Sequence, residues 1–397
     1  MELLSERLRR LKPSATVAMN QKTKDLQAQG IDIINLSVGE PDFNTPDHVK
    51  EAAKKAIDEN YSFYTPVAGY PELRQAIVRK LKRENNLEYK PDEIVVSNGA
   101  KHAIANTIMS LVDKGDEVVI PSPYWVSYAD LVTLAEGTNV IVKTRLEDNF
   151  KMSAGMLEEA ITPRTKALIL CSPSNPTGSV YSYEEMSALA DVLRRHPQVF
   201  VIADEIYEHI NFVGRHVSMA QFEGLRERVI TVNGVSKAYA MTGWRIGYMA
   251  AAPWIVKACI NLQGQFTTGA SSIAQRASIA ALDGDPQVVE NMRQAFERRK
   301  NLIVGLVSEI PGIRLAIPDG AFYIFPDVSA FYGKQYNGFV IKNSDDMSLF
   351  LLDQGHIATV PGSAFGEDTC IRISYATSDE KISEAIRRMK DALALLK

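Results

Sequence analysis

The chain has 397 residues, and its 44 lysines and arginines against 48 aspartates and glutamates give a formal net charge of −4. This balance argues against a protein that binds nucleic acid or an anionic membrane surface through bulk positive charge. The length suggests two or three domains, and a content of 46% hydrophobic and 23% charged residues is ordinary for a globular protein.

Cysteines, histidines and the N-terminal residues exclude further classes of protein. The three cysteines, Cys171, Cys259 and Cys370, lie far apart and are odd in number, which argues against a disulfide framework. Neither C-x-x-C nor H-E-x-x-H occurs, so no metal site is predicted, and His209 and His216 are expected to be solvated or capping groups. The N-terminal stretch lacks the apolar core of a secretory signal, and we expect a cytoplasmic protein.

From about residue 46 the sequence alternates between helix and strand patterns. Thr45-Pro46-Asp47 predicts an N-cap, a proline at the first helical position and an acidic first turn, and a second helix begins at Pro71. A capping box, Ser182 to Glu185, opens the clearest of the later helices. Short apolar runs bounded by turn residues predict strands that are covered on both faces. These runs are residues 94–96, 118–120, 167–170, 200–203, 229–232 and 246–250.

This alternation predicts a doubly wound α/β domain with a large, mostly parallel sheet over residues 46–290. Beyond residue 285 the pattern has fewer strands and more helices. It predicts a long helix from residue 286 to about 309, a helix capped by Ser344 and closed by Gly355, and a final amphipathic helix. We therefore expect a smaller α+β domain over residues 291–397, with residues 1–45 forming an N-terminal arm and part of that domain.

Polar residues follow several of the predicted strands. Ligands bind outside the carboxyl ends of the strands in open α/β sheets, so these residues are candidates for a site. The segment from Ser97 to Lys101 opens a helix and is suited to hold an anion through backbone N–H groups. An amide, a carboxylate, a phenol, an amine and a guanidinium are predicted at the same edge of the sheet. They belong to Asn175, Asp204, Tyr207, Lys237 and Arg245.

Each of these residues alone has an ordinary structural explanation, such as a turn or a helix cap. Together they meet the needs of pyridoxal 5′-phosphate (PLP). An amine must form a Schiff base with the aldehyde, a carboxylate must keep the ring nitrogen protonated, and the phosphate needs hydrogen-bond donors. The set therefore predicts a PLP site.

Several runs of the sequence extend this argument. They are S-V-G-E-P-D-F (37–43), Y-T-P-V-A-G-Y-P-E-L-R (64–74), S-P-S-N-P-T-G (172–178), A-D-E-I-Y (203–207), S-K-A-Y-A-M-T-G-W-R-I-G-Y (236–248) and R-I-S-Y-A (372–376). They resemble the class I aminotransferases of PLP fold type I, and most closely the bacterial aspartate aminotransferases of the branch found in thermophiles. The resemblance covers nearly the whole chain, and the lysine-containing run is its most specific part.

The resemblance implies roles at the cofactor ring. Lys237 forms the internal aldimine and then moves a proton between the substrate Cα and the cofactor. Asp204 pairs with the pyridinium nitrogen, and Asn175 and Tyr207 hydrogen-bond the 3′ oxygen. Trp125 stacks on the ring, and we expect Trp125 and Asn175 to contact the substrate as well.

At the phosphate, the resemblance implies binding by Arg245 together with backbone groups of Gly99 and Ala100. Tyr64 reaches the phosphate from a neighbouring subunit, which implies a homodimer with a shared site. Some members carry a phosphate-binding hydroxyl three residues before the lysine. Here that position is Gly234, and Ser236 is the possible substitute.

At the substrate, the resemblance implies that Arg372 binds the α-carboxylate, helped by backbone groups near Gly39. The thermophile-type branch binds the distal carboxylate with a lysine of the anion loop and a threonine near the N-terminus. These match Lys101, which we also expect at the cofactor, and Thr16.

The implied function is transamination between L-aspartate and 2-oxoglutarate, giving oxaloacetate and L-glutamate. Alternatives with the same cofactor are an aminotransferase that prefers prephenate, aromatic amino acids or alanine, and a PLP-dependent β-lyase. A PLP-sensing transcription regulator needs an added helix-turn-helix, for which the pattern leaves no room. A plain nucleotide-binding protein needs a G-x-G-x-x-G or Walker loop, which is absent. The expected partners are amino acids and 2-oxo acids, not nucleic acid or membrane.

Overall fold

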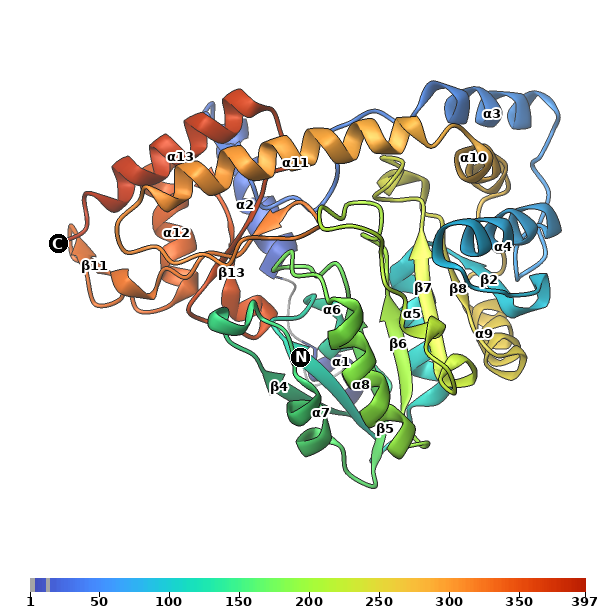
Figure 1. The fold of residues 1–397 in the computed structure, drawn as a ribbon. Coiled ribbons are helices and arrows are strands. Elements are labelled where there is room, and N and C mark those ends of the chain that lie inside the picture. The colour runs from blue at the N-terminus through green and yellow to red at the C-terminus, as the bar shows by residue number, and fades with distance from the viewer. Residues whose placement is uncertain (1–3, 12–14) are drawn as a thin grey trace.

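The computed structural model describes residues 4–11 and 15–397 and consists of a larger α/β part and a smaller α+β part (Figure 1). A seven-stranded sheet with strand order β2-β8-β7-β6-β5-β3-β4 forms the centre of the larger part. All neighbouring strands are parallel except β8, which is antiparallel to both β2 and β7. The strands are β2 (Ile94–Ser97), β3 (Glu117–Ser122), β4 (Thr138–Lys143), β5 (Thr165–Cys171), β6 (Phe200–Asp204), β7 (Val229–Gly234) and β8 (Gly247–Ala250).

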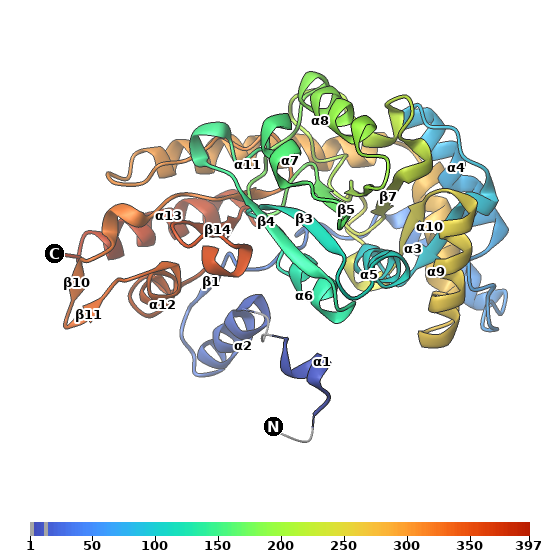
Figure 2. The ribbon, with the colours of Figure 1, turned by 90° about the horizontal axis from the view of Figure 1, so that it is seen from below.

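Helices cover both faces of this sheet, which confirms the predicted doubly wound architecture (Figure 2). Successive strand residues point to opposite faces, so Val118 and Ile120 belong to the hydrophobic cluster that includes residues of α5, α6 and α9, whereas Val119 belongs to the cluster that includes residues of α3, α4, α8 and α10. The helices of the larger part are α3 (Asp47–Asp58), α4 (Pro71–Asn85), α5 (Ala100–Leu111), α6 (Ser127–Leu134), α7 (Ala154–Ala160), α8 (Tyr183–Arg195), α9 (Pro253–Phe266) and α10 (Ser272–Asp283).

Every predicted strand of the sheet is present, and one strand was missed. Strand β4 lies at the edge of the sheet and pairs only with β3. Its residues are half-buried or exposed, so it lacks the continuous apolar run that marks strands covered on both faces. Edge strands of this kind are the ones that a search for buried runs overlooks.

The smaller part is built around three helices and short strands. Helix α11 (Gln287–Ser308) runs along the top of the molecule in Figure 1 and joins the two parts. Its Val289 packs in the core of the larger part, and its Phe296 and Ile303 pack in that of the smaller part. The other helices are α12 (Ser344–Gly355) and α13 (Asp379–Leu393), and the strands are β9 (Tyr323–Ile324), β10 (Gln335–Tyr336), β11 (Phe339–Val340), β12 (Ile357–Ala358), β13 (Val360–Pro361) and β14 (Ile371–Ser374).

The N-terminal residues join the smaller part through β1 (Ile34–Asn35), which pairs in parallel with β12. They also contain α1 (Glu6–Arg9) and α2 (Ala15–Ala28), and α2 lies against β12 and β13. The predicted boundary between residues 290 and 291 falls inside the continuous helix α11. The predicted domain limits therefore stay a proposal. Within the described ranges, no helix has the length and apolar character needed to cross a bilayer.

The capping box of α8 is confirmed, because the Ser182 hydroxyl accepts from the Glu185 N–H and the Glu185 carboxylate accepts from the Ser182 N–H. The predicted cap of α3 is wrong. Pro46 occupies the N-cap position without a side-chain hydrogen bond, while the Thr45 hydroxyl donates to the carbonyl of Ala240. A long-range contact has here replaced the local one.

The predicted cap of α12 is also wrong. Asn343 caps this helix, because its side chain accepts from the Asp346 N–H. Ser344 is the first helical residue, and its hydroxyl donates to Asp368. Gly355 is the last helical residue, and His356 follows in the left-handed conformation at φ +52°.

Candidate active site

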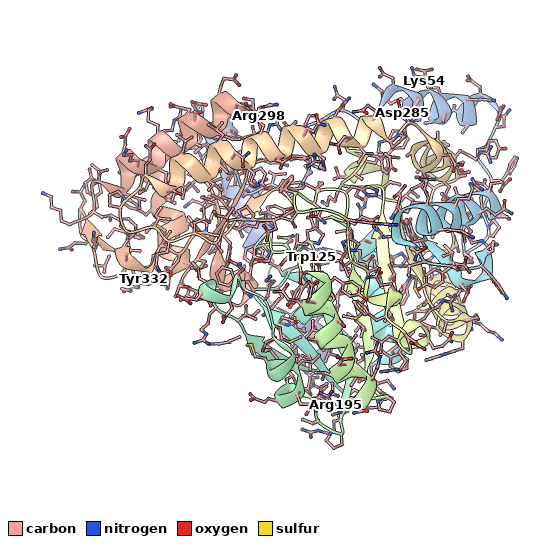
Figure 3. All side chains as sticks on the ribbon, viewed as in Figure 1. Lys54, Trp125, Arg195, Asp285, Arg298 and Tyr332 are labelled. Carbon is pink, nitrogen blue, oxygen red and sulfur yellow. The ribbon has the colours of Figure 1, made fainter. Side chains whose placement is uncertain are left out.

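A cavity of about 290 Å³ lies at the carboxyl ends of β5, β6 and β7, between the larger and the smaller part. Its size is near the lower end of that of small-molecule sites. Trp125 lies on its wall at the centre of the molecule, whereas Lys54, Arg195 and Tyr332 lie at the periphery (Figure 3).

Most of the residues predicted from the sequence line this cavity. Since parallel strands end at the same edge of a sheet, residues that are far apart in the sequence meet there. The lining residues among those predicted are Gly39, Ala100, Lys101, Trp125, Asn175, Asp204, Tyr207, Ser236, Lys237, Arg245 and Arg372. Their roles stay predictions.

Three predicted residues do not line the cavity. Gly99 is the N-cap of α5 at φ +84°, and a side chain there would collide with the guanidinium of Arg245. Tyr64 lies on the loop between α3 and α4 with 95% of its surface exposed. Thr16 belongs to α2, and its side chain lies outside the described residues.

Lys237 follows β7, and its amine points into the cavity. The Nζ atom donates a hydrogen bond of 2.7 Å to the carbonyl oxygen of Gly39. Burial lowers the pKa of Lys237 to about 8, with the charges of Arg372 and Arg245 acting in the same direction and that of Glu40 opposing them. The amine therefore has a sizeable neutral fraction near neutral pH, as a nucleophile or a base requires.

Asp204 ends β6 on the same cavity and is only 4% exposed. Its Oδ2 accepts 2.6 Å from the hydroxyl of Tyr128, and its Oδ1 accepts 3.3 Å from the Ile206 N–H. Burial raises the pKa of Asp204 to about 6, against the opposing effect of these hydrogen bonds. Asp204 and Lys237 both line the cavity. These two described residues nevertheless form no ion pair across it. The arrangement leaves a carboxylate ready to accept a positively charged group.

Arg372 enters the cavity from β14 and is only 2% exposed. Its Nη1 donates to Asn175 Oδ1 (3.0 Å), its Nη2 donates to the carbonyl of Ser37 (2.7 Å), and its Nε has no partner among the described residues. No carboxylate of the described ranges pairs with it, so a buried cation faces the cavity with neutral partners only. Such a cation is costly unless an anion binds to it, which makes this position suited to a carboxylate.

Another group of residues at the cavity provides donors for a second anion. The N-terminus of α5 begins at Ala100, where free N–H groups and the helix dipole favour negative charge. Arg245 lies beside it, with its Nη1 donating 2.8 Å to the carbonyl of Thr242. No side chain fits at Gly234, since a Cβ there would lie 2.8 Å from the carbonyl oxygen of Ile246. Ser236 lines the cavity and supplies a hydroxyl instead.

Sequence reasoning missed two tyrosines of this site. Tyr128 lies one helical turn after Trp125, with the two rings edge to face at 5.3 Å, so helical spacing from Trp125 was a usable signal. Tyr323 lies on β9, and its hydroxyl is 2.8 Å from that of Tyr207. It belongs to an apolar run of the smaller part, and no local pattern indicates that this run returns to the cavity.

Comparisons with known proteins agree with one another. The family described as "Aminotransferase class I and II" matches residues 31–389. A protein from Rickettsia bellii named "Probable aspartate/prephenate aminotransferase" is 48% identical over 399 residues, which are 100% of each chain. The aspartate aminotransferase structure from Rhizobium meliloti has a TM-score of 0.96 at 43% identity and covers 99% of each chain. That from Thermus thermophilus with maleate has a TM-score of 0.93 at 41% identity and covers 99% of this chain and 100% of that one.

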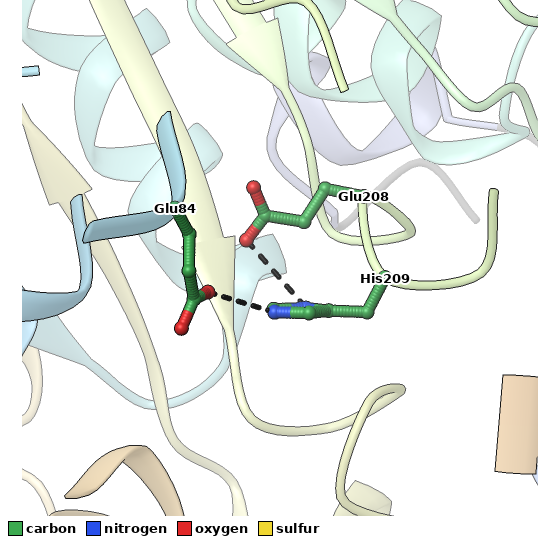
Figure 4. A group of neighbouring side chains, drawn as sticks. All are labelled: Glu84, Glu208 and His209. Atoms are coloured by element: carbon green, nitrogen blue, oxygen red, sulfur yellow. Dashed lines mark hydrogen bonds and ion pairs between the residues drawn. The ribbon is translucent and has the colours of Figure 1, made fainter. Parts of the chain in front are cut away.

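Two clusters of histidine and carboxylate groups lie outside the cavity. His209 contacts Glu84 at 2.9 Å and Glu208 at 3.6 Å (Figure 4). The side chain of His216 is 6% exposed and lies 3.1 Å from Glu205. The expectation that both histidines are solvated or capping groups is therefore wrong, because His209 is half-buried and the side chain of His216 is buried, each against a carboxylate.

Glu208 is the centre of these clusters, and its charge is already compensated. The ammonium of Lys80 contacts it directly, and the amides of Asn85 (2.6 Å) and Asn233 (2.7 Å) donate to its two oxygens. A lysine at this point opposes the binding of a metal cation. We interpret the cluster as a buried ion network that ties the segment after β6 to α4.

We expect Lys80→Met to lower the free energy of unfolding by about 3–5 kcal/mol, because it leaves the buried Glu208 without a cation. Chemical denaturation followed by circular dichroism measures this change. Lys82→Met on the same helix is the matched control, since its ion pair with Glu88 is exposed and contributes less than about 1 kcal/mol. Equal effects of the two substitutions would contradict the network.

Proposed function

The chain belongs to the class I and II aminotransferases, and from this we propose that it transfers the amino group of L-aspartate to 2-oxoglutarate, giving oxaloacetate and L-glutamate. One observation carries the proposal. A single cavity holds the half-buried amine of Lys237, the buried carboxylate of Asp204 and the buried guanidinium of Arg372, and these described groups are not paired with one another. Amino-group transfer needs one such group for the cofactor aldehyde, one for its ring and one for the substrate carboxylate.

We propose PLP as the cofactor, because the donors of the cavity match its parts. Lys237 would hold its aldehyde carbon, and Asp204 would hold its ring nitrogen. The N-terminus of α5 and Arg245 would hold its phosphate, and the side chain of Trp125, which lines the cavity, would face its ring. When bound, PLP supplies an electron sink that makes the Cα–H of an amino acid acidic.

Lys237 has a pKa suited to moving the proton of that Cα–H. Its Nζ, with a pKa lowered to about 8 by burial, can accept a proton and return it near neutral pH. The carbonyl of Gly39 orients this nitrogen. The buried Asp204 stabilises positive charge on a ring nitrogen through a charge-assisted hydrogen bond, while Tyr128 fixes the orientation of its carboxylate.

Arg372 and Lys101 explain a preference for dicarboxylic substrates. The planar guanidinium of Arg372 can hold the α-carboxylate in two hydrogen bonds. Asn175 and the carbonyl of Ser37 fix the orientation of this guanidinium. Lys101 lines the cavity with its ammonium 4.9 Å from the centre of the Trp125 ring. It provides a second cation for a distal carboxylate, whereas the part assigned to Thr16 stays a prediction. The Thermus thermophilus relative was solved with maleate, a dicarboxylate.

Prephenate is a second candidate substrate. The relative from Rickettsia bellii is named for both aspartate and prephenate. Prephenate also carries a 2-oxo acid group and a second carboxylate, so the same two cations, Arg372 and Lys101, can bind it. A preference for aromatic amino acids or alanine would make no use of the charge that Lys101 brings to the cavity.

We also propose that the enzyme is a homodimer. Phe63 and Tyr64 are exposed by 80% and 95% on the loop between α3 and α4. Large exposed apolar side chains mark interaction surfaces, and Tyr64 lies away from the cavity of its own chain. In the dimer, Tyr64 would reach the phosphate end of the partner's site. The cytoplasmic location stays a prediction.

Replacement of Lys237 tests the core of this proposal. We expect Lys237→Ala protein loaded with PLP to lose its visible absorbance band and at least about 100-fold of its turnover, because the substitution removes the amine proposed to hold the aldehyde and to move the proton. Absorbance spectra and a coupled assay with aspartate and 2-oxoglutarate measure the two effects. Lys114→Ala, at an exposed loop position, is the control. Normal turnover of Lys237→Ala would end the proposal.

Replacement of Lys101 tests the preference for dicarboxylic substrates. We expect Lys101→Ser to lower kcat/KM for aspartate by about 30-fold, the effect of losing about 2 kcal/mol of charge interaction, and to leave kcat/KM for alanine nearly unchanged. Steady-state kinetics with both amino acids measure the ratio. Equal losses for the two substrates would reassign Lys101 to the phosphate or to the structure of α5.

A further inference from the structure

Two tyrosines from different parts of the molecule meet at the cavity. Tyr207 follows β6 in the larger part, and Tyr323 belongs to β9 in the smaller part. Their hydroxyl oxygens are 2.8 Å apart, so one donates a hydrogen bond to the other. Both side chains are buried and both line the cavity.

The geometry lets either hydroxyl donate, and the surroundings of Tyr323 favour it as the donor of this pair. The guanidinium of Arg372 lies 4.6 Å from the centre of the Tyr323 ring. A cation at this distance favours the withdrawal of electrons from the phenol and so strengthens its O–H as a donor. Among the described residues, the Tyr323 hydroxyl has no hydrogen-bond partner other than Tyr207. A side chain at position 39 would come within 2.8 Å of this hydroxyl, and Gly39 leaves the space free.

We propose that Tyr323 is a positioning residue, whose hydroxyl donates to the oxygen of Tyr207 and thereby directs the proton of Tyr207 into the cavity. The Tyr207 hydroxyl has one proton, and it cannot donate this proton both to Tyr323 and to a ligand. With Tyr323 as the donor, the proton of Tyr207 is free for an oxygen of the bound cofactor, and it is a stronger donor because hydrogen bonds in a chain polarise one another. The inference rests on the proposed function and on the role that the family resemblance implies for Tyr207, a hydrogen bond to the 3′ oxygen of PLP.

A packing role alone gives a different expectation. The ring of Tyr323 lies 4.7 Å from that of Phe322 and belongs to the core of the smaller part. Tyr323→Phe keeps this ring and removes only the hydroxyl. A residue that only packs would therefore alter neither the spectrum nor the titration of the bound cofactor.

The test is a pH titration of the visible absorbance of full-length protein loaded with PLP. We expect Tyr323→Phe to raise the pH midpoint of this absorbance change by about half to one pH unit, because Tyr207 then donates less strongly to the anionic oxygen of the cofactor. Tyr207→Phe should raise it further. The double variant should match Tyr207→Phe alone, since Tyr323 acts only through Tyr207.

Tyr375→Phe is the matched control. Tyr375 is a fully buried tyrosine of the same core, and its hydroxyl donates 3.1 Å to the carbonyl of Ala321 rather than to a group of the cavity. This variant should keep the wild-type midpoint, and thermal melts of all variants report whether they fold.

A wild-type midpoint in folded Tyr323→Phe protein would overturn the assignment, as would shifts that add in the double variant. Wild-type protein that shows no visible band with PLP would contradict the proposed function itself, and the role of Tyr323 with it.

Discussion

The site depends on two opposite charges that the fold keeps apart. In a buried cavity, an ammonium and a carboxylate attract each other far more strongly than in water, yet Lys237 and Asp204, both described, form no ion pair. The carbonyl of Gly39 holds the amine, and the hydroxyl of Tyr128 holds the carboxylate. Burial disfavours the charged form of each group, so it lowers the pKa of Lys237 and raises that of Asp204. The space between them is where a cofactor can satisfy both.

The fold produces this separation through its topology. Asp204 ends β6 and Lys237 follows the neighbouring strand β7, so both leave the same edge of a rigid sheet that is covered on both faces. The smaller part then closes the cavity with Arg372 and Tyr323. In the proposed function the smaller part binds the substrate α-carboxylate and the larger part binds the cofactor, and the contacts of Arg372 with Asn175 and of Tyr323 with Tyr207 connect the two parts.

The sequence was informative wherever local chemistry decides the structure. The buried strands, the capping box at Ser182 and the polar residues that follow β5, β6 and β7 were all predictable, because strand burial and parallel topology place them. Failures occurred where a distant contact prevails over a local one. The Thr45 hydroxyl is bound to the Ala240 carbonyl, and His216 is buried against Glu205. The edge strand β4 lacks a buried run, and the place of Tyr323 depends on how the two parts pack.

The most direct test of the account is the titration of Lys237 in cofactor-free protein. An amine reacts with an acylating reagent only when neutral, so its reaction rate reaches half of its maximum at its pKa. Competitive labelling at a series of pH values, read by peptide mass spectrometry, measures Lys237 against the exposed Lys114 in the same sample. The account predicts a midpoint near pH 8 for Lys237. A midpoint near the ordinary lysine value of about 10.4 would contradict it, because an amine that is solvated or paired with an acid keeps its proton to that pH.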